Sequence, residues 1–472
     1  MDTSKLGHLV KILGLNCCTV YTRENMSTLR YGKLMIMTDQ DEDGSHIKGL
    51  IINFIHYAHP ELLKLNFIEE FITPIVKATK GNQSQSFFSI PELEEWKGKN
   101  KNWHKYRLKY YKGLGTSTSE EAKEYFLNFQ RHQIKFISSK DDDYWINLAF
   151  DQNNETKNSR KQWLLRWMDD KKQRKIIGQP DEYLYKEDTR EITFSQFVEF
   201  ELILYFVHSL YRAIPSLVDG FKIGQRKVIY TCLKRDDKQD VKVAQLAGVV
   251  GEQTAYHHGE ASLMGTIINL AQDFVGLNNI NLQQPIGQFG TRLGGGHGSA
   301  HARYIFTQLS DITKYIFNSD DDPLLKPLFE NRKPIEPEHY FPIISMVLVN
   351  GINGIGTGFN SKIPNYNPRD IVKNLKLMID GKEPKRMTPF FKNFKGEIVK
   401  IGDHKYLTKG IIKKISQNSE TVKYEITELP IGRGEGQRTT RSKLWSALWR
   451  PQPILPTTEN IIPKKRLSSW YI

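Results

Sequence analysis

A cluster of carboxylates between a short strand and a helix constrains the fold of this chain more than any other feature. The apolar pattern predicts a strand over residues 33–37 and a helix over residues 46–58. Asp39, Asp41 and Asp43 lie in the loop that joins them. Polar side chains at the carboxyl end of a strand are typical of sites in α/β folds. The sequence therefore predicts an α/β region with its acidic residues at one edge of a sheet.

The acidic loop needs a cation to offset its charge. Three carboxylates at alternate positions repel one another unless a cation neutralises them. Hard oxygen ligands suit Mg²⁺, which keeps waters and bridges to phosphate. The loop also begins like a calcium-binding EF-hand, but that motif needs Glu at its twelfth position, where this chain has Leu50. The predicted strand upstream also contradicts an EF-hand. A site for Mg²⁺ or another divalent cation is the leading interpretation, and a solvated acidic turn stays open.

The balance of charge favours a polyanionic partner. The chain has 472 residues, with 67 Lys and Arg against 53 Asp and Glu, and a net charge of +14. Basic side chains displace the counterions condensed on phosphate, so nucleic acid is the leading partner class. An ordinary enzyme with a basic surface stays open on charge alone. Hydrophobic residues make up 39% of the chain, so most of it should fold. The length suggests about three domains.

Cysteine content and hydropathy exclude several classes. The three cysteines, Cys17, Cys18 and Cys232, can form neither a disulfide framework nor a cysteine-rich zinc site. No apolar run approaches about 18 residues, and the N-terminus lacks a signal-peptide pattern. The sequence therefore predicts an intracellular protein with no membrane partner.

A glycine-rich segment, residues 287–298, precedes the dipeptide Arg303-Tyr304. The glycines predict an irregular loop, and the spacing of apolar residues predicts a helix over residues 300–317. A tyrosine on a helix is usually an ordinary core or surface residue. A phenol ionises near pH 10, so it acts as a nucleophile at neutral pH only beside a base, cation or metal. Arg303 offers a permanent positive charge that can bind a phosphate oxygen.

Two long segments resemble the type IIA DNA topoisomerase family. LRYGKLMIMTDQDEDGSHIKGLIINF (residues 29–54) is similar to the family's toprim motif. GQFGTRLGGGHGSAHARYIFTQL (residues 287–309) is similar to its active-site segment, with no insertion or deletion. The likeness continues in unbroken order over residues 6–430. It implies a multidomain α/β and α+β fold with a partial toprim region built on a Rossmann-like parallel sheet, a winged-helix region carrying the tyrosine, and a mixed α/β tower.

The resemblance also assigns roles to residues of both segments. It implies that Asp39 and Asp41 are metal ligands and that Asp43 is a third acidic member. Tyr304 would be the nucleophile that cuts each DNA strand and forms a 5′-phosphotyrosyl link. Arg303 would stabilise the transition state.

Composition and resemblance together divide the chain into five parts. We predict a toprim region over 1–139, a linker with a basic pair over 140–192, a winged-helix region over 193–333, a tower over 334–430 and a divergent basic tail over 431–472. Within them we expect strand and turn over 62–77, a surface insertion over 81–105, an apolar helix over 194–213 and mostly β structure beyond Pro334.

Three shorter motifs extend the resemblance to DNA contacts. Residues 219–227 follow the family's D-G-x-K-P-G-Q-R-K pattern with Ile223 in place of proline, and residues 255–260 match another family string. Residues 351–358 match the segment whose isoleucine wedges between base pairs, which implies that Ile355 bends DNA. An apolar residue in a glycine turn stays open as the alternative. The resemblance implies that double-stranded DNA is contacted by Arg160, Lys161, Lys222, Arg226, Tyr256 and His257.

Further expectations concern the whole enzyme. A toprim region ahead of the tyrosine region is the eukaryotic and large-virus order, which implies a nuclear protein, and residues 463–466 could be a weak import signal. The family's E-G-D-S-A and P-L-R-G-K motifs and any P-loop are absent from this sequence. We therefore expect a fragment that lacks one metal ligand and has no ATP site, with ATP belonging to the full-length enzyme. The family works as a homodimer in which each site joins one subunit's metal loop to the other's tyrosine.

Three hypotheses stay open at this point. The first is the cleavage core of an ATP-hydrolysing type II topoisomerase, an isomerase that controls DNA topology and chromosome segregation. The second is a catalytically incomplete module that binds and bends DNA. The third is a different toprim enzyme, such as a nuclease or primase, against which the Arg303-Tyr304 segment argues.

Overall fold

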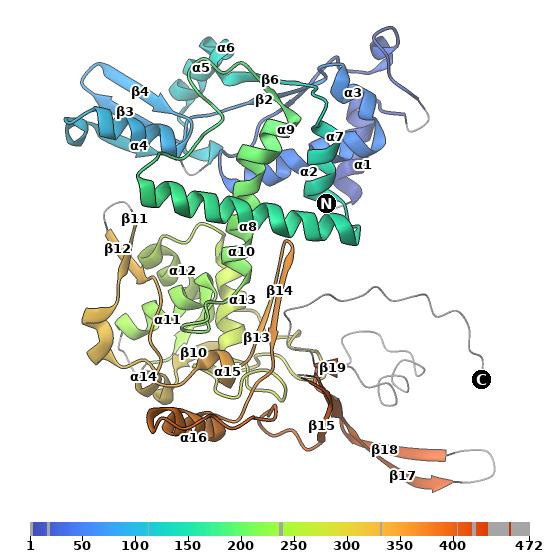
Figure 1. Cartoon of the computed structure of the whole chain (residues 1–472), viewed down its shortest axis with the longest axis vertical. Coiled ribbons are helices and arrows are strands. Elements are labelled where there is room, and N and C mark those ends of the chain that lie inside the picture. The colour runs from blue at the N-terminus through green and yellow to red at the C-terminus, as the bar shows by residue number, and fades with distance from the viewer. Residues whose placement is uncertain are drawn as a thin grey trace. The chain divides into compact units, whose positions relative to one another are not determined.

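The chain forms two compact units, Met1–Leu210 and Tyr211–Ile472 (Figure 1). The computed structural model describes residues 3–16, 19–111, 113–235, 239–330, 333–403, 405–417, 422–432 and 453–454. Cys17, Cys18, the basic run at 463–466 and most of the predicted tail lie outside the described residues. Helix and strand are both abundant in each unit, which confirms the predicted multidomain α/β and α+β class.

The first unit is built around a four-stranded mixed sheet. Its strands lie in the order β1 (Leu34–Ile36), β2 (Ile68–Phe71), β6 (Gln133–Ile137) and β7 (Glu191–Thr193). β1 runs parallel to β2, and β6 runs parallel to β7, but β2 and β6 are antiparallel. The predicted Rossmann-like parallel sheet is therefore wrong for the central pair, because the chain re-enters the sheet from the opposite end after a long excursion between β2 and β6.

In the first unit, the elements predicted on either side of the acidic loop are confirmed, but the segment after α2 differs from its prediction. The predicted strand at 33–37 is β1, and the predicted helix at 46–58 is α2 (Glu42–Ala58). α1 (Thr3–Leu13) and a 3₁₀ turn, η1 (Met26–Thr28), precede them. The segment predicted as strand and turn begins instead with α3 (Pro60–Lys64), because Pro60 stands at a helix start, where its missing N–H costs nothing.

The predicted surface insertion at 81–105 is part of a small folded layer, so that prediction is wrong. β3 (Val76–Lys80) pairs with β4 (Gln83–Phe87) and β5 (Arg107–Tyr110). α4 (Ile90–Lys99) and a 3₁₀ turn, η2 (Trp103–Lys105), connect β4 to β5. Val76, Ala78, Phe87 and Leu93 form a buried core of their own. The polar composition of this segment did not predict a folded layer, because only alternate residues of its strands face the core.

Three further elements follow β5 before the sheet resumes. They are η3 (Leu114–Thr116), α5 (Ser119–Leu127) and α6 (Phe129–His132). The chain is therefore helical from Ser119 to His132, with a break at Asn128.

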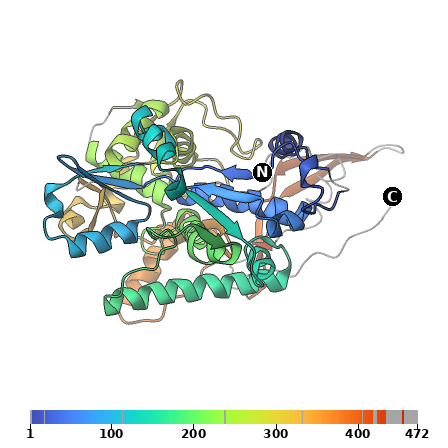
Figure 2. The same ribbon diagram turned by 90° about the horizontal axis from the view of Figure 1, so that it is seen from above.

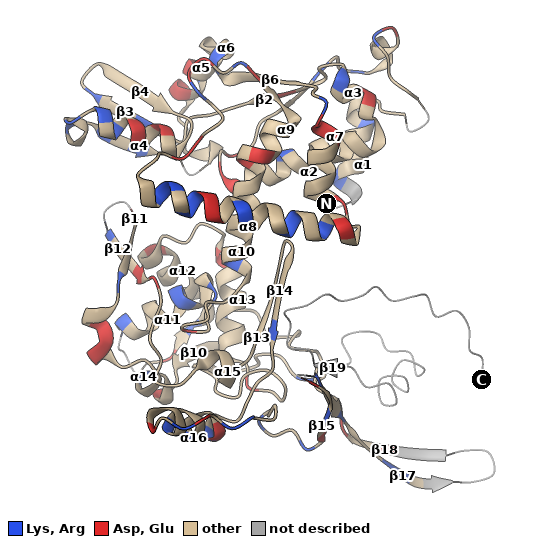
Figure 3. Cartoon of the chain, in the orientation of Figure 1, with Lys and Arg blue, Asp and Glu red and all other residues tan. Residues whose placement is uncertain are grey.

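The predicted linker at 140–192 is largely helical. α7 (Asp142–Phe150) leads to α8 (Asn154–Ile177), which is one uninterrupted helix (Figures 1 and 2). Basic and acidic residues alternate along α8 (Figure 3). The helix is capped by Gly178, whose positive φ of 70° suits a helix terminus. No described helix is long and apolar enough to cross a membrane.

The apolar run at 194–213 is helical, with one local departure from α geometry. α9 (Phe194–Gln196) leads into a π-helical turn, η4 (Phe197–Leu202), and then into α10 (Ile203–Ala213). The rings of Phe194 and Phe197 lie 4.9 Å and 5.7 Å from the ring of Phe136 in β6. The start of the predicted winged-helix region therefore packs within the first unit.

The second unit begins with three helices and a small sheet. α11 (Ile223–Arg235), α12 (Val243–Thr254) and α13 (Glu260–Ala271) share a buried apolar core with the antiparallel sheet β8-β10-β9. The strands are β8 (Val241–Lys242), β9 (Gln283–Ile286) and β10 (Phe306–Leu309). Helices packed on a small antiparallel sheet are consistent with the predicted winged-helix region.

The helix predicted over 300–317 is wrong. Residues 300–305 form a turn, 306–309 form β10, and only α14 (Asp311–Ile316) is helical. β10 pairs with β9 from Phe306 opposite Ile286 to Leu309 opposite Gln283. Hydrogen bonds to a distant strand thus override the local helical spacing of apolar residues.

The remainder of the second unit is rich in β structure, as predicted. Its hairpins are β11 (Pro327–Glu330) with β12 (Lys333–Pro337), β13 (Ile352–Gly356) with β14 (Phe359–Ile363), and β17 (Ile411–Gln417) with β18 (Val422–Glu428). β15 (Glu397–Gly402), β16 (Lys405–Lys409) and β19 (Pro453–Ile454) form a further sheet. The helical elements are η5 (Ser319–Leu324), α15 (Met346–Val349) and α16 (Pro368–Ile379).

Candidate functional site

The acidic loop is held at the N-terminus of α2. Asp41 caps the helix, and its Oδ1 accepts a hydrogen bond from the Gly44 N–H at 2.7 Å. A Cβ at Gly44 would lie 1.9 Å from the carbonyl oxygen of Asp39, so only glycine fits this close turn. Burial raises the pKa of Asp41, the bond from Gly44 opposes that rise, and the charges of Asp43, Asp39 and Glu42 add to it. A nearby cation would relieve this repulsion.

The residues present suit a divalent cation, although they do not form a closed cage. Carboxylate oxygens of Asp39 and Asp41 are hard ligands of the kind that Mg²⁺ prefers. No three His, Cys, Asp or Glu side chains are grouped to hold a metal ion within the described part of the chain. Asp39 precedes α2, Asp41 caps it and Asp43 lies in its first turn, so the three predicted acidic residues do not all lie in the loop.

A buried charge network lies behind the acidic loop and was missed by sequence reasoning. Lys48 of α2 is only 2% exposed, and its Nζ lies 2.8 Å from Glu70 and 2.5 Å from Glu201. Glu201 also accepts hydrogen bonds from the hydroxyls of Ser45, at 2.6 Å, and Tyr185. Burial lowers the pKa of Lys48, but the two carboxylates outweigh it, so that the pKa rises. The network fixes the first turns of α2 to β2 and η4.

Tyr304 is presented to solvent on the loop between β9 and β10. Its side chain is 65% exposed, whereas the neighbouring Ala302 and Ile305 are buried and anchor the turn. The Tyr304 N–H donates to the His301 carbonyl oxygen at 2.8 Å. The guanidinium carbon of Arg303 lies 4.8 Å from the centre of the Tyr304 ring. The structure therefore brings the predicted nucleophile and the predicted stabilising cation together.

The glycine-rich segment reaches this position through close backbone contacts. Gly290 has a φ of +90°, and a Cβ there would lie 2.5 Å from the carbonyl oxygen of Gly296. Gln272 is buried, and its Nε2 donates to the carbonyl oxygens of Phe289 at 2.6 Å and Gly296 at 2.9 Å. Gln272 was also missed by sequence reasoning, because a single glutamine after a helix carries no local signal.

The predicted DNA contacts in the 219–227 motif differ in exposure. Lys222 is half-buried, and burial lowers its pKa. Arg226 is buried, with Nε 2.7 Å from Asp219 Oδ2 and Nη2 3.0 Å from Asp219 Oδ1. Its guanidinium is thus already engaged by a carboxylate, and its contact with DNA stays a prediction. Ile223 is the first residue of α11, a position where proline is also favourable.

The predicted basic pair in α8 shows the same contrast. Arg160 is buried, and it donates to the carbonyl oxygens of Leu148 and Asp151, each at 2.6 Å. Lys161 is exposed. Arg160 therefore ties α8 to α7, while Lys161 is accessible to a polyanion.

Tyr256 and His257 lie on the loop between α12 and α13. The Tyr256 hydroxyl donates to Ser262 Oγ at 3.0 Å, and the exposed His257 lies 3.4 Å from Glu330. Both are close to the surface, and their contacts with DNA stay predictions.

Ile355 projects from the β13–β14 hairpin and is 73% exposed. A Cβ at Gly354 would lie 2.7 Å from the Ala213 carbonyl oxygen, so the missing side chain lets the hairpin approach the end of α10. An apolar residue held out on a closely packed hairpin is suitable for insertion between bases.

Models of two known protein families match segments of this chain, one in each unit. The C-terminal associated domain of TOPRIM matches residues 71–210, and the family of the DNA gyrase/topoisomerase IV A subunit matches residues 212–443. These matches define the class as a topoisomerase chain that joins a toprim-associated region to a region related to the gyrase/topoisomerase IV A subunit.

Curated relatives and a solved structure specify the family within that class. The chain is 57% identical to DNA topoisomerase 2 of Bombyx mori over 92% of its length, and 51% identical to human DNA topoisomerase 2-alpha over 98%. It spans 28% and 30%, respectively, of those relatives' own lengths. The Plasmodium falciparum topoisomerase II DNA-binding, cleavage and re-ligation domain matches with a TM-score of 0.72 and 47% identity, over 92% of this chain and 57% of that one. The chain belongs to the type II DNA topoisomerase family.

Proposed function

We propose that this chain is the DNA-cleavage portion of an ATP-hydrolysing type II topoisomerase, an isomerase that controls DNA topology and chromosome segregation. In this role it cuts both strands of a duplex and reseals them. The observation that carries the proposal is the Tyr304 side chain, 65% exposed beside the Arg303 guanidinium. A nucleophile must reach a phosphate in a duplex, and this tyrosine is accessible.

The chemistry conserves phosphoester bonds. The Tyr304 oxygen attacks phosphorus and loses its proton, the P–O3′ bond breaks, and the 3′ oxygen leaves and takes up a proton. The product is a 5′-phosphotyrosyl link, and resealing reverses these steps without an external energy source. Arg303 binds a non-bridging phosphate oxygen and offsets the charge that builds up there.

Metal binding is assigned to the acidic loop. Asp39 and Asp41 would hold Mg²⁺, with Asp43 as a third acidic neighbour. When bound, the cation would stabilise negative charge on the leaving oxygen. Support comes from the crowding of carboxylates at the start of α2, where burial, and to a smaller extent the charges of Asp43, Asp39 and Glu42, raise the pKa of Asp41.

The partner is double-stranded DNA. A net charge of +14 and an exposed Lys161 favour a polyanion, and Ile355 would wedge between base pairs to bend it. Lys222, Tyr256 and His257 would contact DNA near Tyr304. Arg160 and Arg226 are also assigned to DNA contact, although each is buried against partners within its own unit.

Further features belong to the full-length protein. We propose a homodimer in which the metal loop of one subunit works with the tyrosine of the other. ATP would act through a region outside this chain, and the protein would act in the nucleus. The support is the similarity to eukaryotic topoisomerase 2 sequences at 51% to 57% identity.

A DNA-binding and DNA-bending module is the second candidate. It is favoured by the absence, among the described residues, of three acidic, His or Cys side chains grouped to hold a metal. Such a module would retain the exposed Ile355 and the basic surface without cutting DNA.

The test is a covalent-adduct assay. Supercoiled plasmid is incubated with the chain and Mg²⁺ and then treated with denaturant, and protein-linked 5′ ends are measured. We expect adducts that disappear in Tyr304→Phe and persist in Tyr315→Phe, which alters another exposed tyrosine of the second unit. Binding without adducts supports the bending module, and free 5′ phosphates support a nuclease.

A further inference from the structure

The carboxylate of Asp39 contacts the main chain of a segment far away in sequence. Its Oδ1 accepts a hydrogen bond from the Leu114 N–H at 2.7 Å. A Cβ added at Gly113 would lie 3.0 Å from both carboxylate oxygens of Asp39. The backbone of residues 113–114 therefore lies directly against this side chain, and a side chain at position 113 would press on the Asp39 carboxylate.

The main chain of Asp39 is fixed independently of its side chain. Its carbonyl oxygen packs against Gly44 in the first turn of α2, where a Cβ would approach to 1.9 Å. Backbone and carboxylate are thus held from two sides, by α2 and by residues 113–114. Such a residue has little rotational freedom left.

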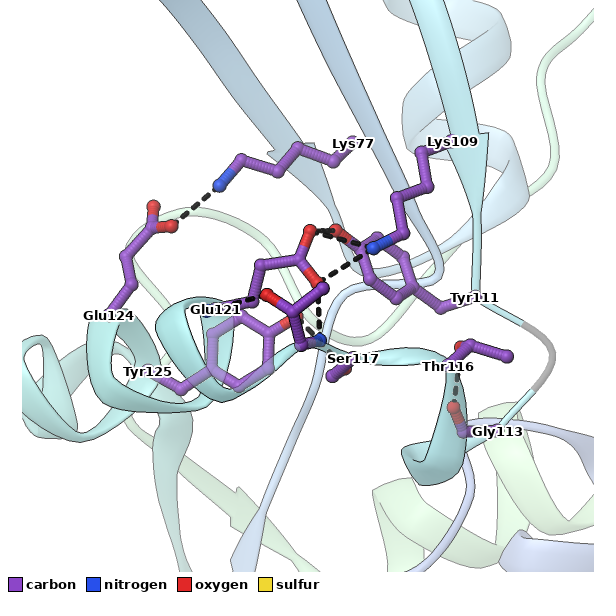
Figure 4. Close-up of polar contacts among 10 residues, drawn as sticks. Lys77, Lys109, Tyr111, Gly113, Thr116, Ser117, Glu121, Glu124 and Tyr125 are labelled. Atoms are coloured by element: carbon purple, nitrogen blue, oxygen red, sulfur yellow. Dashed lines mark hydrogen bonds and ion pairs between the residues drawn. The ribbon is translucent and has the colours of Figure 1, made fainter.

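The 113–117 loop is itself braced (Figure 4). Thr116 Oγ1 donates to the Gly113 carbonyl oxygen at 2.7 Å, and Ser117 Oγ lies 3.2 Å from the Tyr125 hydroxyl. Thr118 and Glu121 form a capping box at the start of α5. The loop therefore enters α5 in a defined conformation.

Glu121 joins the two ends of this loop. Its carboxylate accepts hydrogen bonds from Lys109 Nζ at 2.7 Å and 2.9 Å and from the Tyr111 hydroxyl at 2.6 Å (Figure 4). It also accepts from the Thr118 N–H at 2.8 Å. Because Lys109 lies in β5 and Glu121 in α5, these bonds hold the two elements that flank residues 113–117 together.

We propose that the main chain of Gly113 and Leu114 is a seat that orients the Asp39 carboxylate for a divalent cation. Leu114 N–H engages Oδ1, and Oδ2 is the oxygen that we assign to the cation. Glu121 is a positioning residue that braces the seat. Groups that hydrogen-bond to a metal ligand set its orientation, and their loss typically weakens metal binding by about 10-fold to 100-fold. The inference rests on the proposed metal role of Asp39.

Two glycines of one loop provide a matched test. Gly113→Ala places a methyl group against Asp39, whereas Gly115→Ala meets no atom within 4 Å. Mn²⁺ binding to the full chain is measured by electron paramagnetic resonance, together with the melting temperature of the metal-free chain. We expect Gly113→Ala to weaken Mn²⁺ binding by about 10-fold or more with little change in melting temperature, and Gly115→Ala to match wild type. Equal affinity of all three proteins overturns the seat.

A metal-free measurement separates the seat from the proposed function. Hydrogen exchange at the Leu114 amide is compared between wild type and Asp39→Ala. We expect faster exchange in the variant, because the amide loses its acceptor, whether or not the chain cuts DNA. Unchanged exchange would mean that the contact does not exist, and would contradict the proposal that residues 113–114 orient Asp39. A chain that shows the contact but forms no DNA adduct would contradict only the proposed cleavage function.

Discussion

Two loops of this molecule are held in place by different contacts: the acidic loop before α2, and the loop between β9 and β10 that carries Tyr304, called here the tyrosine loop. Behind the acidic loop lies a buried network of charges, with Lys48 between Glu70 and Glu201. The tyrosine loop is held mainly by main-chain packing, with Gly290 against Gly296 and Gln272 bonded to two carbonyl oxygens. In this molecule the helix behind the acidic loop is fixed through compensating charge, whereas close backbone contacts shape the loop that projects the phenol.

Removing the buried lysine should have the largest effect. Lys48→Met would leave Glu70 and Glu201 buried without their cation, which should cost about 3–5 kcal/mol. Urea unfolding followed by hydrogen exchange in peptides of each unit measures this, with the loss expected in the first unit alone. Lys99→Met, at an exposed pair with Glu95, should leave both units unchanged. A similar loss in both units would show that the network does not act locally.

A methyl group in the tyrosine loop should have the next largest effect. Gly290→Ala combines a φ of +90° with a 2.5 Å approach to the Gly296 carbonyl oxygen, and should destabilise the loop by about 1–3 kcal/mol. Adduct yield should fall while the first unit keeps its stability. Gly298→Ala has a φ of +83° and no atom within 4 Å, so it carries the backbone strain without the clash. Equal losses in both variants would argue that close packing is not what holds this loop.

Truncating the exposed isoleucine should affect DNA shape more than protein stability. Ile355→Ala should reduce the bend angle, measured by fluorescence energy transfer between labelled DNA ends, because the wedge is lost. Affinity should change little, since phosphate contacts dominate it, and stability should change by less than about 0.5 kcal/mol. Ile343→Ala, another exposed isoleucine of this unit, should leave the bend intact. An unchanged bend in Ile355→Ala refutes the assignment.

The smallest effect concerns acid stability in the first unit. Burial raises the pKa of Glu121, but bonds from Lys109, Tyr111 and Thr118 outweigh it and lower the pKa to about 2. Since the folded pKa lies below the unfolded value of about 4.5, this stabilisation is present above pH 4.5 and is lost as pH falls towards 2. Glu121→Gln should therefore lose stability at neutral pH and approach wild type in acid. Glu120→Gln should parallel wild type throughout, and the same parallel in Glu121→Gln would contradict the bracing role.

Sequence reasoning succeeded where the determinant is local. The strand at 33–37 and most of α2 follow from apolar spacing, and the structure adds the cap at Asp41. The exposed Arg303-Tyr304 pair and the projecting Ile355 occupy the segments that the resemblance indicated. Their roles in catalysis and bending stay predictions.

Sequence reasoning failed where partners are distant. The antiparallel β2–β6 pair and the strand at 306–309 depend on pairing that no local pattern encodes. Ser45 and Glu201 are 156 positions apart, and the contact of Asp39 with Leu114 is made by a backbone N–H that every residue except proline has. A lysine inside the apolar stretch of α2 was the one local signal for the buried network.

The π-helical turn between α9 and α10 lets this stretch hold one residue more than regular α winding would. Deleting one residue of Phe197–Leu202 would return the turn to α geometry while the helix after it keeps its register, so Phe206 and Val207 would stay buried. A deletion in the middle of α10 has no wide turn to absorb it and would rotate everything after it by roughly 100°. One lost codon would therefore be tolerated in the wide turn, but a few residues later it would separate the helix from its own core.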